Sequence, residues 1–353
     1  MTFSGSYDPA DVSFLLRPIA LVPTPVAAKE RLIQNGRHYS EMIGPEALPD
    51  ADYLRLYEAA LARNGARLGA DVAALVTALT AAGGREVVIA SLARAGTPIG
   101  VLLRRELTRR GVAAVHYSLS IIRGRGIDRV ALEHLAARHD PADVIFVDGW
   151  TGKGAIGDEL ERSLAGRPFG FEPRLVVVAD PAGRATLAAT GDDYLIASGL
   201  LGAIGSGLVS RSILSAATVG LGEFHACVAY PELAPHDRSR AFVDVVAAHA
   251  AAAPAVLPPP LDLAALRSRA ADALAVVMDA AEVGDRHRVK PGIAEATRAL
   301  LRRVPDRLFL RDPADPDVAH LRHLAARQKV AMGPLPADSP YRAVAVIAAV
   351  EAI

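Results

Sequence analysis

The sequence predicts an α/β protein with a parallel, doubly wound sheet and a second, smaller α/β domain. Short apolar runs of strand type alternate with helix-type segments through the middle of the chain, an order typical of parallel sheets. Hydrophobic residues, mostly Ala, Leu and Val, make up 51% of the chain and aromatic residues 5%, which suits helices packed on a sheet and excludes a disordered chain. A stretch rich in Ala and Pro near residue 250 divides the 353 residues into two units.

The first unit, residues 1–250, begins with about 50 residues that are rich in turns and show no clear period. Apolar positions then recur at helical spacing from Asp50 to Ala82. The strand-type runs that follow are 87–90, 113–117, 144–147 and 175–178, and the helix-type segments between them are 98–110, 128–139 and 153–165. Because ligands bind at the carboxyl ends of the strands in such sheets, the loops after these strands are where a site is expected.

The second unit follows a predicted linker at 251–264 and comprises residues 265–353. Proline-rich sequence of this kind cannot hold a sheet, which is why the boundary is placed there. The predicted elements are a helix at 263–281, a basic segment at 286–290, a helix at 293–303, a strand at 308–310, a helix around 318–327 and a strand at 343–349.

Charge and cysteine content exclude several classes of protein. The 39 basic and 39 acidic residues balance, so the whole molecule offers no bulk attraction for nucleic acid or membrane. The single cysteine, Cys227, excludes an internal disulfide and a thiolate metal cage, and it favours a reducing, cytoplasmic compartment. The apolar stretch 194–222 is interrupted by Arg211 and by glycines, which argues against a membrane span. A homodimer is left open.

Two strand-to-helix loops, Ala93–Gly100 and Asp148–Gly154, are predicted to bind phosphate groups. Glycines let backbone N–H groups converge, and the following helix N-terminus adds a positive dipole. Thr97 is predicted as an N-cap with Pro98 as the first helical residue. An ordinary turn is the alternative for each loop. The predicted ligand-binding residues are Ala93, Arg94, Ala95, Gly96, Thr97, Thr151, Gly152, Lys153, Gly154 and Arg211.

Between the two loops lies a segment, residues 120–128, in which Arg123 and Arg125 alternate with glycines. This pattern predicts a mobile cationic loop that closes over a polyphosphate, and a plain solvated loop is the alternative. Asp148, at the end of its strand, is placed to accept hydrogen bonds from sugar hydroxyls or to reach Mg²⁺ through water. No residue is assigned as a direct metal ligand.

This order of loops resembles the type I phosphoribosyltransferases and, more closely, the phosphoribosyltransferase-like StiP family of tellurite-resistance and stress-response gene clusters. The segments that carry the resemblance are 5–8, 92–100, 121–128, 147–154 and 207–211. It implies an Mg²⁺-dependent enzyme that joins a base to ribose 5-phosphate from phosphoribosyl pyrophosphate, with Arg94, Arg123, Arg125 and Asp148 as catalytic residues. The resemblance also implies a parallel sheet of the type I phosphoribosyltransferase fold. Such enzymes have two adjacent acids where this chain has only Asp148 before Gly149; Asp180, or Asp192 with Asp193, are candidate replacements.

Two other functions stay open. Loss of the second acid favours a non-catalytic regulator that binds a nucleotide and RNA. The family label "cysteine protease" points to the third, in which His225, two positions before Cys227, would activate the thiol. The surrounding sequence, residues 223–230, indicates a buried strand, in which a cysteine is commonly inert.

The region 285–311 holds eight basic and three acidic residues, a local excess that fits contacts to RNA phosphates. A solvated amphipathic helix is the alternative. The pattern Gly-x-x-Glu-x-x-Arg, followed by a strand, resembles the Pelota-type RNA-binding domain over roughly residues 285–350. Such domains usually carry Lys at the position of Arg298. The resemblance implies RNA contacts by Lys290, Gly292, Glu295, Arg298 and Arg302.

Overall fold

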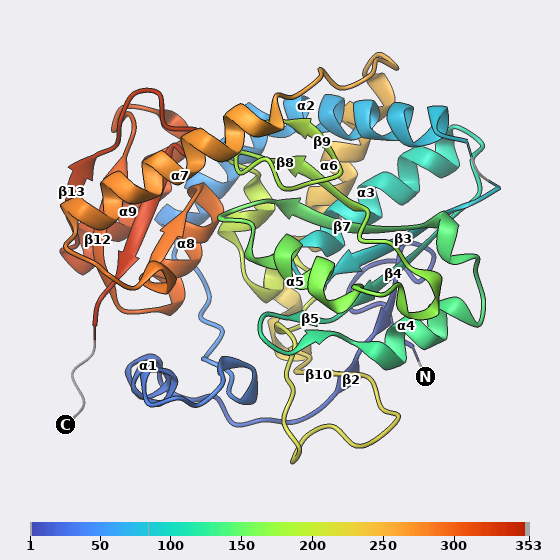
Figure 1. Ribbon diagram of the computed structural model, residues 1–353, viewed down its shortest axis with the longest axis horizontal. Coiled ribbons are helices and arrows are strands. Elements are labelled where there is room, and N and C mark those ends of the chain that lie inside the picture. Colours follow the sequence, from blue (N-terminus) through green and yellow to red (C-terminus); the bar gives the residue numbers. More distant parts are fainter. Residues whose placement is uncertain (1, 84, 350–353) are drawn as a thin grey trace.

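A central six-stranded sheet dominates the computed structural model, which describes residues 2–83 and 85–349 (Figure 1). All neighbouring strands in it run parallel, as predicted. Three of the four inner strands are rich in Val and Ile and largely buried, which is the pattern of a sheet covered on both faces. In spatial order the strands are β1 (Ser13–Leu15), β4 (Ala114–Leu119), β3 (Val87–Leu92), β7 (Val144–Trp150), β8 (Leu175–Ala179) and β9 (Leu187–Thr190).

Helices cover both faces of this sheet, so the sheet is doubly wound. On one face lie α2 (Ala51–Ala81), α3 (Gly96–Arg109) and α6 (Ser239–Ala252), which pack against one another. On the other face lie α4 (Arg129–Ala136) and α5 (Ala155–Ser163), whose apolar side chains join a separate core cluster. The parallel α/β architecture with a smaller second domain is therefore confirmed.

Several segments differ from the sequence prediction, including β9, α6 and the strand at residues 331–334, none of which was predicted. The first 50 residues contain regular structure that has no apolar period, namely β1, β2 (Arg17–Pro18) and α1 (Val26–Gln34). The cationic loop at 120–128 is a short antiparallel hairpin of β5 (Ile121–Ile122) and β6 (Gly126–Ile127), and not an irregular loop. Strand β2 pairs with β10 (Ala226–Cys227), which ties the N-terminal segment to the cysteine region.

The second domain is a four-stranded mixed sheet with helices packed against it. Helix α6 extends to Ala252, into the stretch predicted as linker, and residues 253–262 contain no helix or strand. None of the described helices is both long enough and apolar enough to cross a membrane. The elements of this domain are α7 (Leu263–Ala280), β11 (Val289–Pro291), α8 (Ile293–Arg302), β12 (Pro305–Leu310), α9 (Ala319–Gln328), β13 (Ala331–Pro334) and β14 (Ala343–Ile347).

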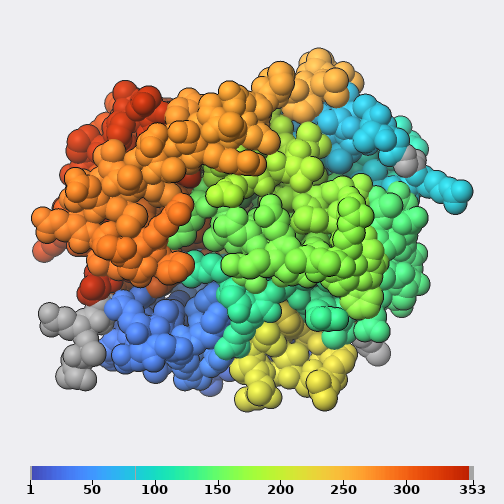
Figure 2. Space-filling view, in the orientation of Figure 1, coloured from blue at the N-terminus to red at the C-terminus, as the bar shows by residue number. Residues whose placement is uncertain are grey.

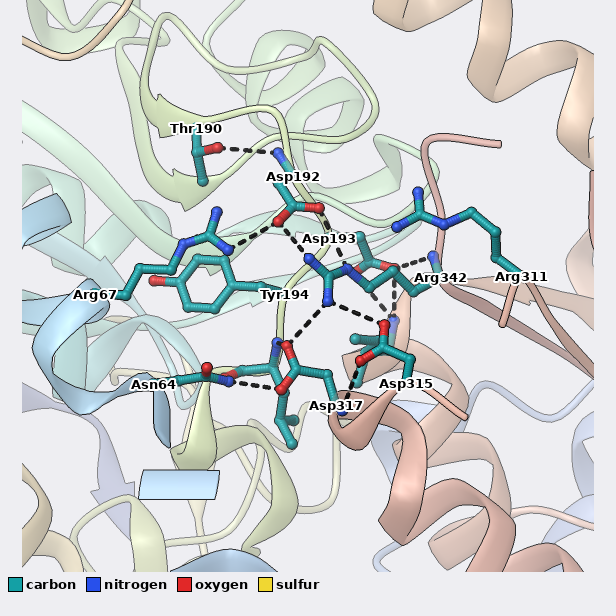
Figure 3. A network of polar contacts seen from close by, with 12 residues as sticks. Asn64, Arg67, Thr190, Asp192, Asp193, Tyr194, Arg311, Asp315, Asp317 and Arg342 are labelled. Atoms are coloured by element: carbon teal, nitrogen blue, oxygen red, sulfur yellow. Dashed lines mark hydrogen bonds and ion pairs between the residues drawn. The ribbon is translucent and has the colours of Figure 1, made fainter. Parts of the chain in front are cut away.

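The two domains share one hydrophobic core. Ile293 and Leu300 of α8 belong to the same buried cluster as Leu200 and Tyr53 of the first domain. Beside this core, Figure 3 shows Arg342 of the second domain surrounded by three carboxylates. It bonds to Asp192 of the first domain at 2.6 Å and, within its own domain, to Asp315 at 3.0 Å and Asp317 at 3.3 Å.

Asp317 and Asp193 reach in opposite directions across this domain interface. Asp317, which is buried, accepts hydrogen bonds from Arg63 at 2.8 Å and Asn64 at 2.8 Å on α2. The buried Asp193 of the first domain accepts the backbone N–H of Ile293 at 3.1 Å, and burial raises its pKa to about 7. The apolar contact and the polar network together hold the domains in one arrangement.

Candidate functional site

A cavity of about 770 Å³ lies between the two domains. The residues that line it come mainly from five parts of the chain: the N-terminal segment with α1, the loops at the carboxyl ends of β3 and β7, the hairpin at 121–123, the segment 198–212, and β11 with α8 of the second domain. Figure 2 shows N-terminal residues (blue), residues from the middle of the chain (green) and residues of the second domain (orange) meeting on one face of the molecule. The cavity thus lies where ligands of parallel α/β sheets are found.

Most of the predicted site residues line this cavity, although they come from distant parts of the sequence. Gly96, Thr97, Arg125 and Gly292 do not line it. The predicted residues that do are Ala93, Arg94, Ala95, Arg123, Asp148, Thr151, Gly152, Lys153, Gly154, Arg211, Lys290, Glu295, Arg298 and Arg302.

The residues of the first loop that lie outside the cavity have structural contacts. Helix α3 begins at Gly96 with Ala95 as its N-cap, so Thr97 is inside the helix and is not the predicted cap. Its hydroxyl forms a buried hydrogen bond with Ser118 at 2.8 Å. A Cβ on Gly96 would lie 2.2 Å from the carbonyl oxygen of Val147, so glycine is required there for close packing of α3 on β7.

The other two outlying residues are held elsewhere. Arg125 donates to Glu41 and to the carbonyl of Leu214, on the outer side of the hairpin. Gly292 has a φ of +87°, a conformation that favours glycine, and stands beside Asp193 at the domain interface. Its conformation explains the glycine without a ligand.

The loop after β7 is stabilised internally. Thr151, expected to donate to a phosphate, donates to the buried Asp180 at 2.5 Å. Asp180 also accepts the backbone N–H groups of Arg184 and Ala185, so it braces the next loop and is no substitute for the missing acid at Gly149. Burial raises the pKa of Asp148 to about 6, partly offset by the charge of Arg298.

Arg94 is paired with an acid that the sequence analysis missed. Its guanidinium bonds to Glu46 at 3.0 Å and to the carbonyl of Val209 at 2.6 Å. Arg302 reaches the same carboxylate at 3.2 Å from the second domain. Although burial opposes it, the charges of Arg94 and Arg302 lower the pKa of Glu46 to about 2. Glu46 lies in the turn-rich N-terminal region, where no pattern marks it.

Six other basic side chains line the cavity without forming an ion pair among the described residues: Lys29, Arg123, Lys153, Arg211, Arg288 and Lys290. Burial lowers the pKa of Lys29 and of Lys153 to about 8 and that of Lys290 to about 7, and neighbouring cations lower each further. Burial likewise lowers the pKa of Arg211 to about 10. Sequence reasoning missed Lys29, because the helix that carries it has no apolar stripe.

Cys227 lies apart from this cavity. Its thiol is fully buried, and burial raises its pKa to about 12. The neighbouring His225 shares a hydrogen bond of 2.8 Å between its Nδ1 and the hydroxyl of Ser120. The backbone N–H of His225 donates to Asp128 at 2.6 Å. The cysteine lies in a buried strand, as predicted, but this strand covers only Ala226–Cys227 of the predicted residues 223–230, and Glu223 is exposed.

The fold and the cavity define a two-domain α/β protein with a basic cleft between its domains. A model of the family described as "Tellurite-like stress resistance cysteine protease StiP" matches residues 5–247, and the "PELOTA RNA binding domain" model matches residues 268–349. The curated protein named "Cysteine protease StiP" from Acinetobacter baylyi (strain ATCC 33305 / BD413 / ADP1) is 42% identical over 366 residues, covering 98% of this chain and 94% of that protein. No solved structure matches. This chain belongs to the StiP family.

These comparisons confirm the predicted StiP and Pelota resemblances and overturn the predicted activity. Both the family and the relative are described as cysteine proteases, so the prediction of a phosphoribosyltransferase acting on phosphoribosyl pyrophosphate is wrong. Magnesium was expected only for that transferase chemistry, and it conflicts with the description of the family and the relative as cysteine proteases. In the described part of the chain, no group of three or more His, Cys, Asp or Glu side chains is arranged to hold a metal ion.

Proposed function

We propose that this chain is a cysteine-dependent peptidase with Cys227 as its nucleophile. The proposal rests on the family and on one observation, that Cys227 is the sole cysteine in the sequence. A thiol enzyme built on this chain therefore has a single candidate nucleophile. Because a catalytic thiol must stay reduced, the proposal includes a cytoplasmic location.

The residues around Cys227 supply the other groups that a thiol peptidase uses. His225 lies two positions away, and burial lowers its pKa, which favours a neutral imidazole that can accept a proton. Asp128 accepts the backbone N–H of His225 and also caps α4 through Val130. A thiol, an imidazole and a carboxylate thus come from one small region of the fold.

Because the thiol of Cys227 is buried, turnover requires a change of conformation around it. A thiol with a pKa of about 12 is protonated at neutral pH, whereas the thiolate is the nucleophile. We therefore propose that this conformation is a resting state. In the active state His225 exchanges its bond with Ser120 for one with Cys227, and the thiol gains polar surroundings when substrate binds.

Replacement of the sulfur tests the proposal. Purified protein is incubated under reducing conditions with unfolded protein substrates, and new peptide termini are identified by mass spectrometry. Wild-type protein should generate cleavage products, and Cys227→Ser should generate none while keeping the thermal midpoint of the wild type to within a few degrees. Ser120→Ala, which releases His225 from its present hydrogen bond, should retain cleavage. Products that persist in Cys227→Ser, or no products from wild type, would contradict the assignment.

A further inference from the structure

We propose that the cavity between the domains binds a small, multiply charged oxyanion, held by Lys29, Lys153 and Lys290 together with Arg211. None of these residues contacts Cys227, and Cys227 does not line the cavity. The inference is therefore independent of the peptidase proposal and concerns a second site in the same chain.

Lys29 is the residue that points most directly to an anion. It is 7% exposed, its side chain lines the cavity, and within the described chain its ammonium has no hydrogen-bond acceptor. The adjacent Glu30 cannot neutralise it fully, because both oxygens of that carboxylate bond to Arg303, at 2.5 and 2.7 Å. A buried charge without a partner is unfavourable, so the structure retains a cation here that a ligand would balance.

Lys153 and Lys290 face the same cavity and are bonded only to backbone carbonyl groups. The ammonium of Lys153 donates to Arg286 at 2.8 Å and Val289 at 3.2 Å, and that of Lys290 donates to His287 at 2.7 Å. A carbonyl satisfies the hydrogen bond but leaves the positive charge uncompensated. These bonds orient both ammonium groups without neutralising them.

The net positive charge of the side chains that line the cavity also favours an oxyanion as the ligand. Ten basic and four acidic side chains line the cavity, and two of the acids, Glu30 and Glu295, already bond to Arg303 and Arg298. The sequence contains only four lysines, and three of them line this cavity. A volume of about 770 Å³ is typical of a small-molecule site. Phosphate, sulfate and polycarboxylate groups supply the negative oxygens that several ammonium groups can share.

The fluorescence of Trp150, the single tryptophan in the sequence, can report ligand binding in the cavity. Trp150 lines the cavity, and the guanidinium of Arg298 lies 5.0 Å from its ring centroid, so a ligand that moves Arg298 changes the environment of the indole. Tripolyphosphate is titrated into the full-length protein at constant ionic strength while intrinsic fluorescence is recorded. We expect a saturable change, and no such change when sodium chloride replaces tripolyphosphate at equal ionic strength.

Two variants, one with a lysine replaced inside the cavity and one with a lysine replaced outside it, test whether tripolyphosphate binds in the cavity. Lys29→Met should weaken tripolyphosphate binding roughly tenfold to a hundredfold, which corresponds to loss of a charge-assisted contact. The same variant without ligand should melt at a temperature equal to or above that of the wild type, since it removes an uncompensated buried charge. Lys329→Met, at an exposed position outside the cavity, should leave both quantities unchanged. Should Lys29→Met fail to fold, Lys290→Gln tests the same loss of affinity.

Three outcomes would overturn the inference. The first is a fluorescence response to tripolyphosphate that sodium chloride reproduces at equal ionic strength. The second is unchanged affinity in the cavity variant. The third distinguishes the source of the phosphate: a 5′-phosphorylated RNA oligonucleotide that binds through Lys29 when tripolyphosphate does not would make the cavity part of an RNA interface and not a small-oxyanion site.

Discussion

Three lysines in one cavity make the charge of that cavity sensitive to pH near neutrality. Lys290 faces Lys153, Arg303, Arg123 and the single acid Glu295, and its pKa of about 7 follows from burial and then from these cations. As the pH rises through about 7 to 8, Lys290 and then Lys29 and Lys153 lose their protons, so affinity for an oxyanion should fall.

Replacement of Lys290 by arginine tests this pH dependence, because a guanidinium keeps its charge throughout the range. Between pH 6.5 and 8.5 the dissociation constant of tripolyphosphate should rise less steeply for Lys290→Arg than for wild type. Lys329→Arg, away from the cavity, should follow the wild-type profile. Equal slopes for wild type and Lys290→Arg would show that Lys290 does not titrate in this interval.

Single residues also show which features could not be predicted from the sequence. The glycine-rich loop at 148–154 could be located because a strand, a loop and a helix follow one another in the sequence. The partner of Thr151 could not, because Asp180 lies 29 positions away and contacts it only through the fold. The loop shape was also a poor guide to chemistry: glycine turns after parallel strands recur in proteins of many activities, which is why the transferase prediction was wrong.

At the scale of elements, apolar periodicity found most of the helices that bury apolar faces. It missed α6, although Phe242, Val243 and Val246 are buried there, and it missed α1, which buries no apolar face. The long α2 begins one residue after the predicted start and ends one before the predicted end. In α1 the buried residues are Lys29 and Glu30, so its sequence gives no apolar signal. The hairpin β5–β6 was missed because each of its strands has only two residues.

Arg342 joins elements of the two domains through ion pairs with three carboxylates. Arg342→Met leaves Asp192, Asp315 and Asp317 without their shared cation, and removing one partner from a largely buried ion-pair network costs about 3 kcal/mol. The urea midpoint of the variant should fall accordingly.

Arg311, which Figure 3 shows near the same network, provides the control. Its guanidinium donates to the carbonyl of Ser339 at 2.8 Å and forms no ion pair within the described residues. Arg311→Met should therefore cost about 1 kcal/mol, the usual value of one neutral hydrogen bond. Comparable losses in the two variants would mean that the carboxylates around Arg342 contribute nothing specific.

At the scale of the molecule, the sequence predicted two domains but not how they pack. Helix α7 runs from the first domain, where Arg267 donates to the carbonyl of Gly183 at 2.7 Å, to the second, where Leu274 and Val277 enter the core. Figure 1 shows α7 (orange) running from beside β8 to the second domain at the left of the view. Contacts between Ile293 of α8 and the first-domain core join residues far apart in the sequence, which single-sequence patterns do not reveal. Whether residues 265–353 fold alone stays a prediction.

Cutting the connection between the domains tests how strongly they associate. A specific protease site inserted within residues 253–262, where there is no helix or strand, allows the chain to be cleaved after folding. Because the domains share an apolar core and the Arg342 network, the two fragments should elute together in size-exclusion chromatography. Separate elution at physiological salt would show that the linker, and not the interface, holds the domains together.

Helix α1 is fastened to the rest of the molecule largely by charge. Glu30 pairs with Arg303, and Glu46, in the segment that follows, pairs with Arg94 and Arg302. Dissolved ions screen these pairs only weakly, because the carboxylate of Glu30 is buried and that of Glu46 is nearly so. A wall of the cavity is therefore held by charge even in concentrated salt. Only acid strong enough to protonate the carboxylates would loosen it, while the apolar core beneath would hold.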